Sequence, residues 1–285
     1  MTTAAETGCI AGAADALRIH VRPVKARKEY EAFVELQRET WGRDFTDTVP
    51  VTMMGTAVRM GGICLGAFDS DGELQGAVFG VTGPREGELG HWSHMLAVRR
   101  AARNLGIGKR LKFAQRKAAA AMGVAAVYWS FDPLVGRNAY FNLNQLGASV
   151  IEYVPDMYGT TNSVLHRLGT DRFIARWDLG DDPGAVVRER RDMVAGAGTM
   201  GRAVVGVPGE CAVPPVGADV VEAVVPADIR SVEERCLDEA LAWRAANRMA
   251  FVGLLGEGFE VVGFARGREY GRYVLKRGAG SMGGL

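Results

Sequence analysis

VRRAARNLGIGKRL, residues 98–111, gathers five cationic side chains around two glycines and contains no carboxylate. The wider run from Leu89 to Phe131 also lacks Asp and Glu, although eight Lys and Arg side chains lie in it. A solvated helix face usually mixes both signs, so the missing negative charge is expected to belong to something that the protein binds. Because the net charge of the whole chain is only +1, the cluster is a local feature. It favours a small anionic ligand over a nucleic acid.

The composition bounds the class of protein. With 285 residues and 48% apolar side chains, the chain can fill one large core or two modest ones. Its four cysteines, at 9, 64, 211 and 236, are too scattered to predict a disulfide framework or a zinc site, so we expect reduced thiols. The first residues lack a cationic start and a leucine-rich core, and no run of about 18 apolar residues follows. We therefore expect a cytoplasmic enzyme or binding protein without a membrane partner.

Apolar periodicity on both sides of the cationic stretch predicts alternating strands and helices. Before it we expect a strand (17–24), a helix (28–42), a Met-rich helix after Pro50, a hairpin (63–83) and a strand (88–98). After it we expect a helix (107–123), a buried strand (124–131), a short helix (137–147) and three strands (148–154, 163–168 and 172–179). The end of the chain reads as a strand (220–225), a helix (231–255) and two strands (259–265 and 271–275).

Composition also suggests how the chain divides. We expect a loose tail (1–17), a main domain (18–178), a linker or irregular segment (179–217) and a C-terminal α/β extension (218–278). The extension echoes the main domain 111 positions later: Ala139, Leu143, Gly147, Val150, Ile151 and Tyr153 match Ala250, Leu254, Gly258, Val261, Val262 and Phe264. A degenerate second half and an ordinary helix–glycine–strand ending both stay open.

Gly106 and Gly108 would allow a phosphate to approach the backbone of this loop closely. A strand that ends at Val98, a basic loop, Gly106-x-Gly108 and an amphipathic helix place free backbone N–H groups at a helix N-terminus. The helix dipole is positive there, so these groups can receive a phosphate. A side chain at either glycine would hold an anion away from the amides.

Arg103 to Gly108 reads Arg-x-x-Gly-x-Gly, and here the chain resembles the GNAT family, the Gcn5-related acyl-coenzyme A N-acyltransferases. The wider match is MLAVRRAARNLGIGKRL (95–111), then a strand, then NAYFNLNQLGA (138–148), where the family has a helix that runs into Leu-Gly. The resemblance spans roughly residues 18–168. It implies an α+β fold of the α/β/α GNAT type, whose central sheet is mixed, mostly antiparallel, and contains a splayed strand pair.

Two other phosphate-binding patterns fit poorly. A Walker loop needs Ser or Thr after the lysine, and Arg110 follows Lys109. Residues 196–201 form a Gly-x-Gly-x-x-Gly, but the segment before them is not a strand and the segment after them is not a helix. We therefore do not expect NTP or dinucleotide chemistry.

The resemblance implies acetyl-CoA or another acyl-CoA as co-substrate, and no metal. The loop would hold the pyrophosphate, the main chain of the preceding strand would hold the pantetheine, and two asparagines could hydrogen-bond the pantetheine or the acceptor. The coenzyme-binding residues expected on this basis are Leu96, Ala97, Val98, Arg103, Asn104, Leu105, Gly106, Ile107, Gly108, Lys109, Arg110, Asn138 and Asn142.

Acyl transfer to an amine needs a base, oxyanion donors and an acid for the leaving thiolate. Of Glu88, His91 and His94, we favour His94 as the base, because an imidazole titrates near neutral pH and His94 shares strand parity with Leu96 and Val98. His91 lies on the opposite face unless a bulge intervenes.

The family's usual acid is a tyrosine four residues before the Leu-Gly glycine, where this chain has Leu143. Tyr140 is the candidate substitute, with Tyr158 as a second, and either ring could instead serve packing. Asp132, at the carboxyl end of a central strand, could bind a cationic acceptor or cap the turn before Pro133.

These features predict an acyl-CoA-dependent N-acyltransferase that acetylates a small-molecule amine by direct transfer in a ternary complex. Its partners would be the acyl-CoA donor and the amine, with no nucleic acid; a homodimer stays open. Two alternatives remain, a coenzyme-binding sensor or scaffold that transfers nothing, and an acyl-CoA hydrolase or decarboxylase of the same fold.

Overall fold

The computed structural model describes residues 18–196, 203–209 and 217–278. The expected loose tail, two of the four cysteines (Cys9 and Cys211) and most of the Gly-x-Gly-x-x-Gly pattern lie outside these ranges. The chain divides into two compact units, which are Met1–Trp129 with Thr161–Leu165, and Ser130–Thr160 with His166–Leu285.

The first unit contains the cationic stretch. Its elements are β1 (His20–Pro23), α2 (Arg27–Trp41), α3 (Val51–Arg59), β2 (Ile63–Phe68), β3 (Leu74–Arg85), β4 (Glu88–Val98), a 3-10 turn (Arg100–Ala102), α4 (Ile107–Ala120) and the start of β5 (Ala126–Phe131). Strands β1 to β4 pair antiparallel in chain order, and β5 pairs parallel to β4. The expected α+β class with a mixed, mostly antiparallel sheet is confirmed.

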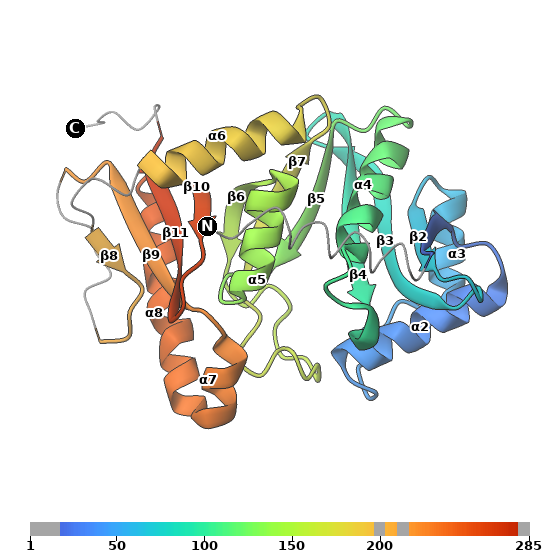
Figure 1. The fold of residues 1–285 in the computed structure, drawn as a ribbon, viewed down its shortest axis with the longest axis horizontal. Coiled ribbons are helices and arrows are strands. Elements are labelled where there is room, and N and C mark those ends of the chain that lie inside the picture. Colours follow the sequence, from blue (N-terminus) through green and yellow to red (C-terminus); the bar gives the residue numbers. More distant parts are fainter. Residues whose placement is uncertain (1–17, 197–202, 210–216, 279–285) are drawn as a thin grey trace. The chain divides into compact units, whose positions relative to one another are not determined.

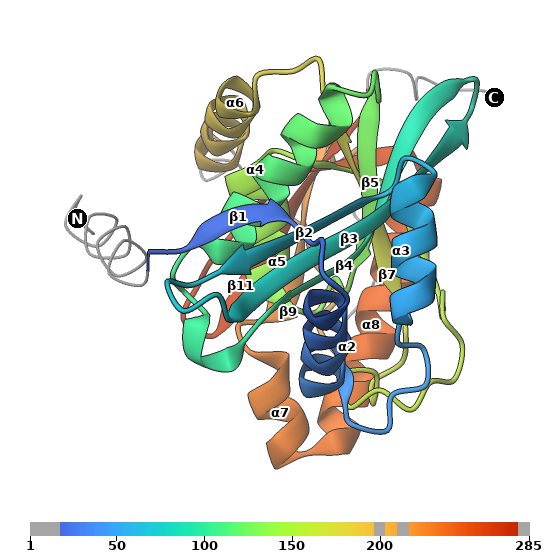
Figure 2. The same ribbon diagram turned by 90° about the vertical axis from the view of Figure 1, so that its right-hand side faces the viewer.

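Helices cover both faces of this sheet (Figure 2). Helices α2 and α3 pack on one face of β2–β4, where Phe33, Leu36 and Met54 are fully buried with Phe79. Helix α4 packs on the other face and approaches closely at Gly76, where a Cβ would lie 3.1 Å from Ile107. The sheet is thereby the middle layer of three.

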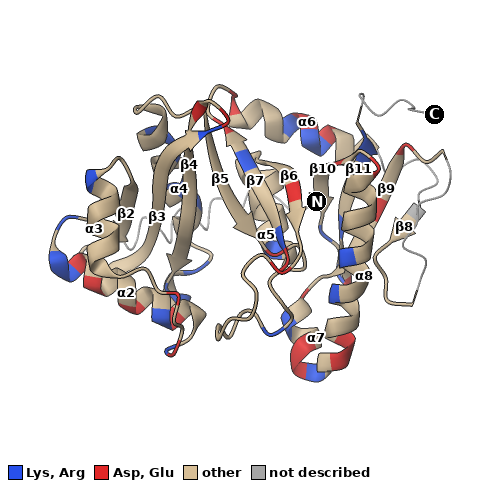
Figure 3. Ribbon diagram, turned by 180° about the vertical axis from the view of Figure 1, so that it is seen from behind, with Lys and Arg blue, Asp and Glu red and all other residues tan. Residues whose placement is uncertain are grey.

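Helix α2 shows what a solvated helix face looks like in this protein. Its outer surface alternates acidic and basic side chains (Figure 3), with Arg27 paired to Glu31 and Arg43 to Glu35. The stretch from 98 to 111 has no such alternation.

The second unit consists of the end of β5 and all later elements apart from residues 161–165 (Figure 1). These elements are α5 (Gly136–Ala139), a π-helical segment (Tyr140–Leu146), β6 (Ser149–Val154), β7 (Arg172–Asp178), α6 (Pro183–Gly196), β8 (Ala203–Val205), β9 (Val220–Pro226), α7 (Ile229–Arg235), α8 (Leu237–Gly256), β10 (Phe259–Ala265) and β11 (Tyr270–Arg277). Strand β6 pairs antiparallel with β7, and the four-stranded sheet has the order β10-β11-β9-β8.

Three sequence-based expectations differ from this structure. Residues 163–168 form turns and no strand, because β6 supplies the partner of β7. Helix α6 lies within residues 179–217, which were expected to be a linker or irregular segment. The helix expected over 231–255 is two helices, broken at Cys236, whose φ of −155° and ψ of 107° are extended.

Aromatic rings fill the core of the second unit. Phe173 of β7 is fully buried and lies 4.7 Å from Phe251 and 5.5 Å from both Tyr153 and Tyr273, measured between ring centroids. All three contacts are edge-on, an arrangement that the ring quadrupole favours.

The two segments that echo each other in sequence also share backbone features. Each runs from a helix through a glycine with positive φ, Gly147 at 77° and Gly258 at 80°, into an antiparallel pair of strands. The register of the first pair slips between Val150 and Glu152, and that of the second between Val261 and Gly263, which are equivalent positions in the echo. A degenerate repeat stays a prediction, and the matching glycines and register shifts are consistent with it.

We predict that Phe173→Ala lowers the free energy of unfolding by about 3–5 kcal/mol, because it leaves a cavity among the rings of Tyr153, Phe251 and Tyr273. Val252→Ala, at a position of α8 that is 49% exposed, should change it by no more than about 0.5 kcal/mol. Urea unfolding of both variants, followed by near-ultraviolet circular dichroism, tests this. Equal stabilities would mean that the aromatic cluster does not hold the second unit together.

Candidate functional site

The loop between β4 and α4 is shaped by two left-handed residues. Asn104 has φ 67° and Gly106 has φ 74°, and Gly106 is the N-cap of α4 with no side-chain cap. Left-handed backbone is costly for most residues, while glycine and asparagine tolerate it. The first-turn amides of α4 have no partner within the helix, so they are available at its positive end.

Space above the loop is open. A Cβ built on Gly106 would meet no atom within 4 Å. Arg103, Asn104, Lys109 and Arg110 are exposed around it. The residues present therefore fit a phosphate group, with amides below and cations at the rim.

Strand β4 pairs with its two neighbours very unequally. It pairs with β3 along its length, from Glu88 to Val98, but with β5 only from Gly90 to Trp92. Both strands continue beyond this parallel pairing, β4 to Val98 and β5 to Phe131. The main chain of Leu96, Ala97 and Val98 thus lies beyond the last residue of β4 paired with β5.

Several of the cations are bound by the protein itself. Arg99 pairs with Glu39 of α2 at 2.8 Å and donates to the Leu74 carbonyl. Arg110 donates to the Ile19 carbonyl at 2.7 Å, and Arg103 to the Val98 carbonyl at 3.2 Å. Glu39, distant in sequence, thus supplies part of the negative charge that the stretch lacks.

A β-bulge sets the position of His94. The register of β3 and β4 shifts so that Phe79 opposes Met95 while Gly80 opposes Ser93, and His94 is the extra residue. Its ring contacts Phe79 edge-on at 6.5 Å, on the sheet face that α2 and α3 cover. The parity argument that grouped it with Leu96 was therefore wrong, because the bulge inverts the alternation.

The electrostatics of His94 suit a proton acceptor. The residue keeps contact with solvent, and burial of part of the ring lowers the pKa of His94 below its usual value. The neutral imidazole therefore predominates at neutral pH.

Both ring nitrogens of His91 make hydrogen bonds within the protein. It is fully buried under α4, where the Gln115 amide donates to Nε2 at 3.0 Å and Nδ1 donates to the Thr82 hydroxyl at 2.9 Å. Burial, and then the charge of Lys112, lower the pKa of His91 to about 4. With both nitrogens bound, this ring does not compete with His94 as a base.

Lys112 of α4 is a buried amine that contacts a hydroxyl and an aromatic ring. Its Nζ donates to the Ser93 hydroxyl at 2.8 Å and lies 3.7 Å from the centroid of the Trp129 ring. Burial lowers the pKa of Lys112 well below its usual value. Sequence reasoning counted this side chain among the ligand-facing cations, but the structure places it in the core.

Asp132 follows β5 and has protein partners on both oxygens. Oδ1 accepts from the Leu134 N–H at 2.9 Å, the turn cap that the sequence allowed, and Oδ2 accepts from Arg244 at 2.7 Å. Arg244 lies on α8 and is 5% exposed. A cationic acceptor would have to displace that arginine, so the structure gives the expected acceptor role of Asp132 no support. In the sequence, Arg244 is one arginine within a long predicted helix, and nothing near it points to Asp132 as its partner.

The other predicted residues of the second unit lie on α5 and the π-helical segment. The half-buried Tyr140 ring packs against Arg266, whose guanidinium carbon is 3.6 Å from the ring centroid. Asn138 is half-buried and Asn142 is buried. Leu143 is fully buried, so the position of the family's usual tyrosine is a core position here.

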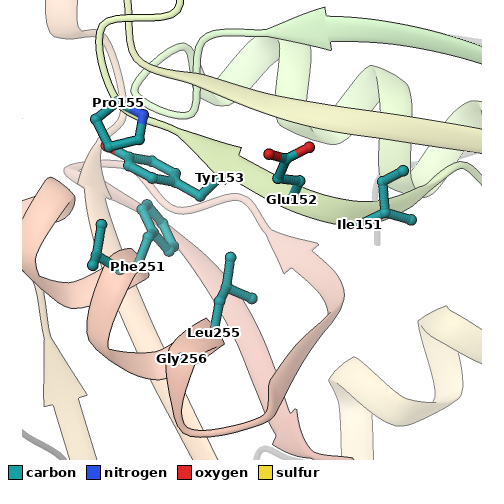
Figure 4. A pocket seen from close by; sticks show the side chains of 8 residues that line it. Ile151, Glu152, Tyr153, Pro155, Phe251, Leu255 and Gly256 are labelled. Atoms are coloured by element: carbon teal, nitrogen blue, oxygen red, sulfur yellow. The ribbon is translucent and has the colours of Figure 1, made fainter.

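A shallow pocket in the second unit contains none of the predicted site residues. It is lined by Ile151, Glu152, Tyr153 and Pro155 around β6, and by Phe251, Val252, Leu255 and Gly256 of α8 (Figure 4). Within the described residues, no group of three or more metal-ligating side chains gathers and no helix is long and apolar enough to cross a membrane.

No family model and no curated protein matches the chain. Among solved structures, it is similar to aminoglycoside 6'-acetyltransferase type Ii, at 22% identity over 57% of this chain and 99% of that chain, with a TM-score of 0.45. It is also similar to an acetyltransferase of the GNAT family from Staphylococcus aureus Mu50, at 15% identity over 56% and 99%, with a TM-score of 0.44. The NatC complex bound to Gag peptide and CoA is similar at 15% identity over 56% and 98%, with a TM-score of 0.44.

We predict that Lys112→Met raises the free energy of unfolding by about 1 kcal/mol at pH 7, because folding no longer buries an amine that water would protonate. The folded-state pKa lies below the usual 10.5, so this cost is largest at low pH and fades as pH rises toward 10.5. The advantage of the variant should therefore shrink by pH 10.

Urea unfolding at pH 7 and pH 10 measures the effect, with the exposed Lys117→Met as the control on the same helix. A variant less stable than wild type at pH 7 would show that the contacts with Ser93 and Trp129 outweigh the cost of burial.

Proposed function

We propose that this protein is an acyl-CoA-dependent N-acyltransferase of the GNAT superfamily that acetylates a small-molecule amine. One observation carries the proposal. The uncapped N-terminus of α4 follows a left-handed, cation-rimmed loop at the end of a strand that its neighbour pairs with over only three residues.

Each part of this arrangement fits a part of the donor. The amides of Ile107 and Gly108, with Arg103 and Lys109 at the rim, suit the pyrophosphate, and the main chain of β4 suits the amide-bearing pantetheine. The residues from Leu96 to Val98 would hold it through backbone groups, which explains why their side chains need no particular polarity.

His94 would accept the proton of the attacking amine. The bulge brings this imidazole to the face shared with α2 and α3, and leaves it accessible and neutral. A neutral imidazole can take the proton directly or through one water.

The α2–α3 connection would bind the acceptor. It contains Phe45, which stacks on Trp41 with 6.2 Å between centroids, and it is held by residues 161–165 through Asn162 and Ser163. An aromatic wall fixed in this way suits an amine with some apolar surface.

We predict that Gly106→Glu abolishes detectable binding of acetyl-CoA, because a carboxylate would occupy the phosphate position. Gly123→Glu is the matched control, since Gly123 has φ 77°, faces open space and lies at the other end of the same helix. Calorimetry should give the control the wild-type Kd. If Gly106→Glu bound as tightly as wild type, the donor site would lie elsewhere.

We also predict that His94→Gln lowers kcat by about 100-fold and removes the loss of activity expected of the wild type as pH falls through the lowered pKa of His94, because a protonated imidazole cannot accept a proton. His20→Gln, on the exposed strand β1, should retain the wild-type profile. An unchanged acid limb in His94→Gln would assign the base to another group.

A thiol-release assay over a panel of amines separates this function from its alternatives. Release that depends on an amine is acyl transfer, and release without an amine is hydrolysis. Binding without release would identify a sensor, for which the buried Leu143 would be the structural reason.

A further inference from the structure

Strand β4 changes the face of the sheet on which its odd-numbered residues lie. Before the bulge, His91 and Ser93 lie on the α4 side and hydrogen-bond to side chains of that helix. After the bulge, Met95 and Ala97 belong to the apolar core under α2 and α3. Because side chains alternate along a strand, one extra residue between these two pairs lets each pair face its own core.

The partner strand β3 keeps its alternation through the same region. Phe79 lies in the core under α2 and α3, opposite Met95. Gly80 lies opposite Ser93, and a Cβ added to this glycine would collide with the His91 ring. The irregularity is therefore confined to β4, and the extra residue is the candidate base.

Apolar packing alone does not fix which residue of β4 is extra. If the bulge moved by one position, Ser93 would become the extra residue and Gly80 would oppose His94. Met95 and Ala97 would stay in their core, but the imidazole would turn to the α4 side. The same shift would carry the Ser93 hydroxyl away from α4. A contact of that hydroxyl is thus what distinguishes the two positions of the bulge.

Lys112 supplies this contact from inside the core. The residue is 2% exposed, and its Nζ lies 2.8 Å from the Ser93 hydroxyl and 3.7 Å from the centroid of the Trp129 ring. Gln115, three residues later on the same face of α4, bonds His91 in the same way. Both α4-facing residues before the bulge are therefore tied to one helix.

The tie makes the shifted bulge unfavourable. Moving Ser93 would leave the Lys112 amine buried without its hydroxyl partner, and an unsatisfied polar group in the core is costly. Burial of the amine itself opposes folding, because it lowers the pKa of Lys112 well below its usual value. A buried polar group that costs stability and selects one register has its best-attested use in this kind of arrangement.

We propose that Lys112 is a positioning residue that fixes the bulge at residue 94 and thereby holds the His94 imidazole on the face shared with α2 and α3. This inference rests on the proposed function, in which that imidazole accepts the proton of the amine. Lys112 acts through the Ser93 hydroxyl and the backbone of β4, from the opposite face of the sheet. It takes no part in the chemical step.

The kinetic test uses Lys112→Met, a variant whose stability should not fall. We expect its kcat to drop about tenfold with the KM for acetyl-CoA unchanged, because the imidazole no longer has one fixed position. Lys117→Met, on the exposed face of the same helix, should keep the wild-type kcat. A Lys112→Met variant with the wild-type kcat would overturn the inference.

Double variants show whether the lysine acts through the base. Lys112→Met combined with His94→Gln should be no slower than His94→Gln alone. Losses that multiply would mean that the lysine acts independently of the imidazole, against the inference. Ser93→Ala should reproduce the loss in kcat, and a fully active Ser93→Ala would show that the hydrogen bond is not the tie.

The position of the bulge can also be measured without activity. The rings of His94 and Phe79 lie 6.5 Å apart between centroids, so a nuclear Overhauser contact should join them in the wild type. This contact should be lost in Lys112→Met and kept in Lys117→Met. An unchanged contact in Lys112→Met would overturn the inference. A wild type that transfers no acyl group to any amine would refute the proposed function, and the ring contact would then decide by itself whether Lys112 fixes the bulge.

Discussion

The unequal pairing of β4 is the constraint on which the candidate site depends. A strand inside a sheet normally satisfies its backbone polar groups on both edges. Here β3 satisfies one edge along the whole strand, whereas β5 leaves after Trp92. Polar main-chain groups beyond that point need another partner, and the loop and helix that follow add more free amides and positive charge at the same end of the strand. The proposed donor site combines these main-chain groups of β4 with the amides and cations of the loop and helix.

Much of the first unit could be predicted because its signals are local. Glycines at 106 and 108, the helix after them and the strand before them are read from neighbouring residues, and the structure has each element in the expected place. The bulge at His94 was not predicted, because one extra residue in a strand leaves no mark in the alternation until the partner strand fixes the register. The same limit explains Lys112, whose burial depends on how α4 lies over Ser93 and Trp129.

Ion pairs between distant parts of the chain could not be predicted from the sequence, for a related physical reason. Asp132 and Arg244 are separated by more than a hundred residues, and Glu39 answers Arg99 from another layer of the fold. An ion pair of this kind is decided by tertiary packing, while the sequence shows only an acid after a strand and an arginine in a helix. The turn-capping role of Asp132 was predictable since its partner lies two residues away.

The burial of Lys112 has a consequence for selectivity. A thioester acylates an amine only after the amine has lost its proton, and burial lowers the pKa of Lys112, whose amine lies in the core between α4 and the sheet. Basicity alone therefore cannot decide which nitrogen reacts. If the proposed activity holds, the sheet and helix that lower the pKa of this lysine also separate it from the donor, so burial itself protects the lysine from acylation.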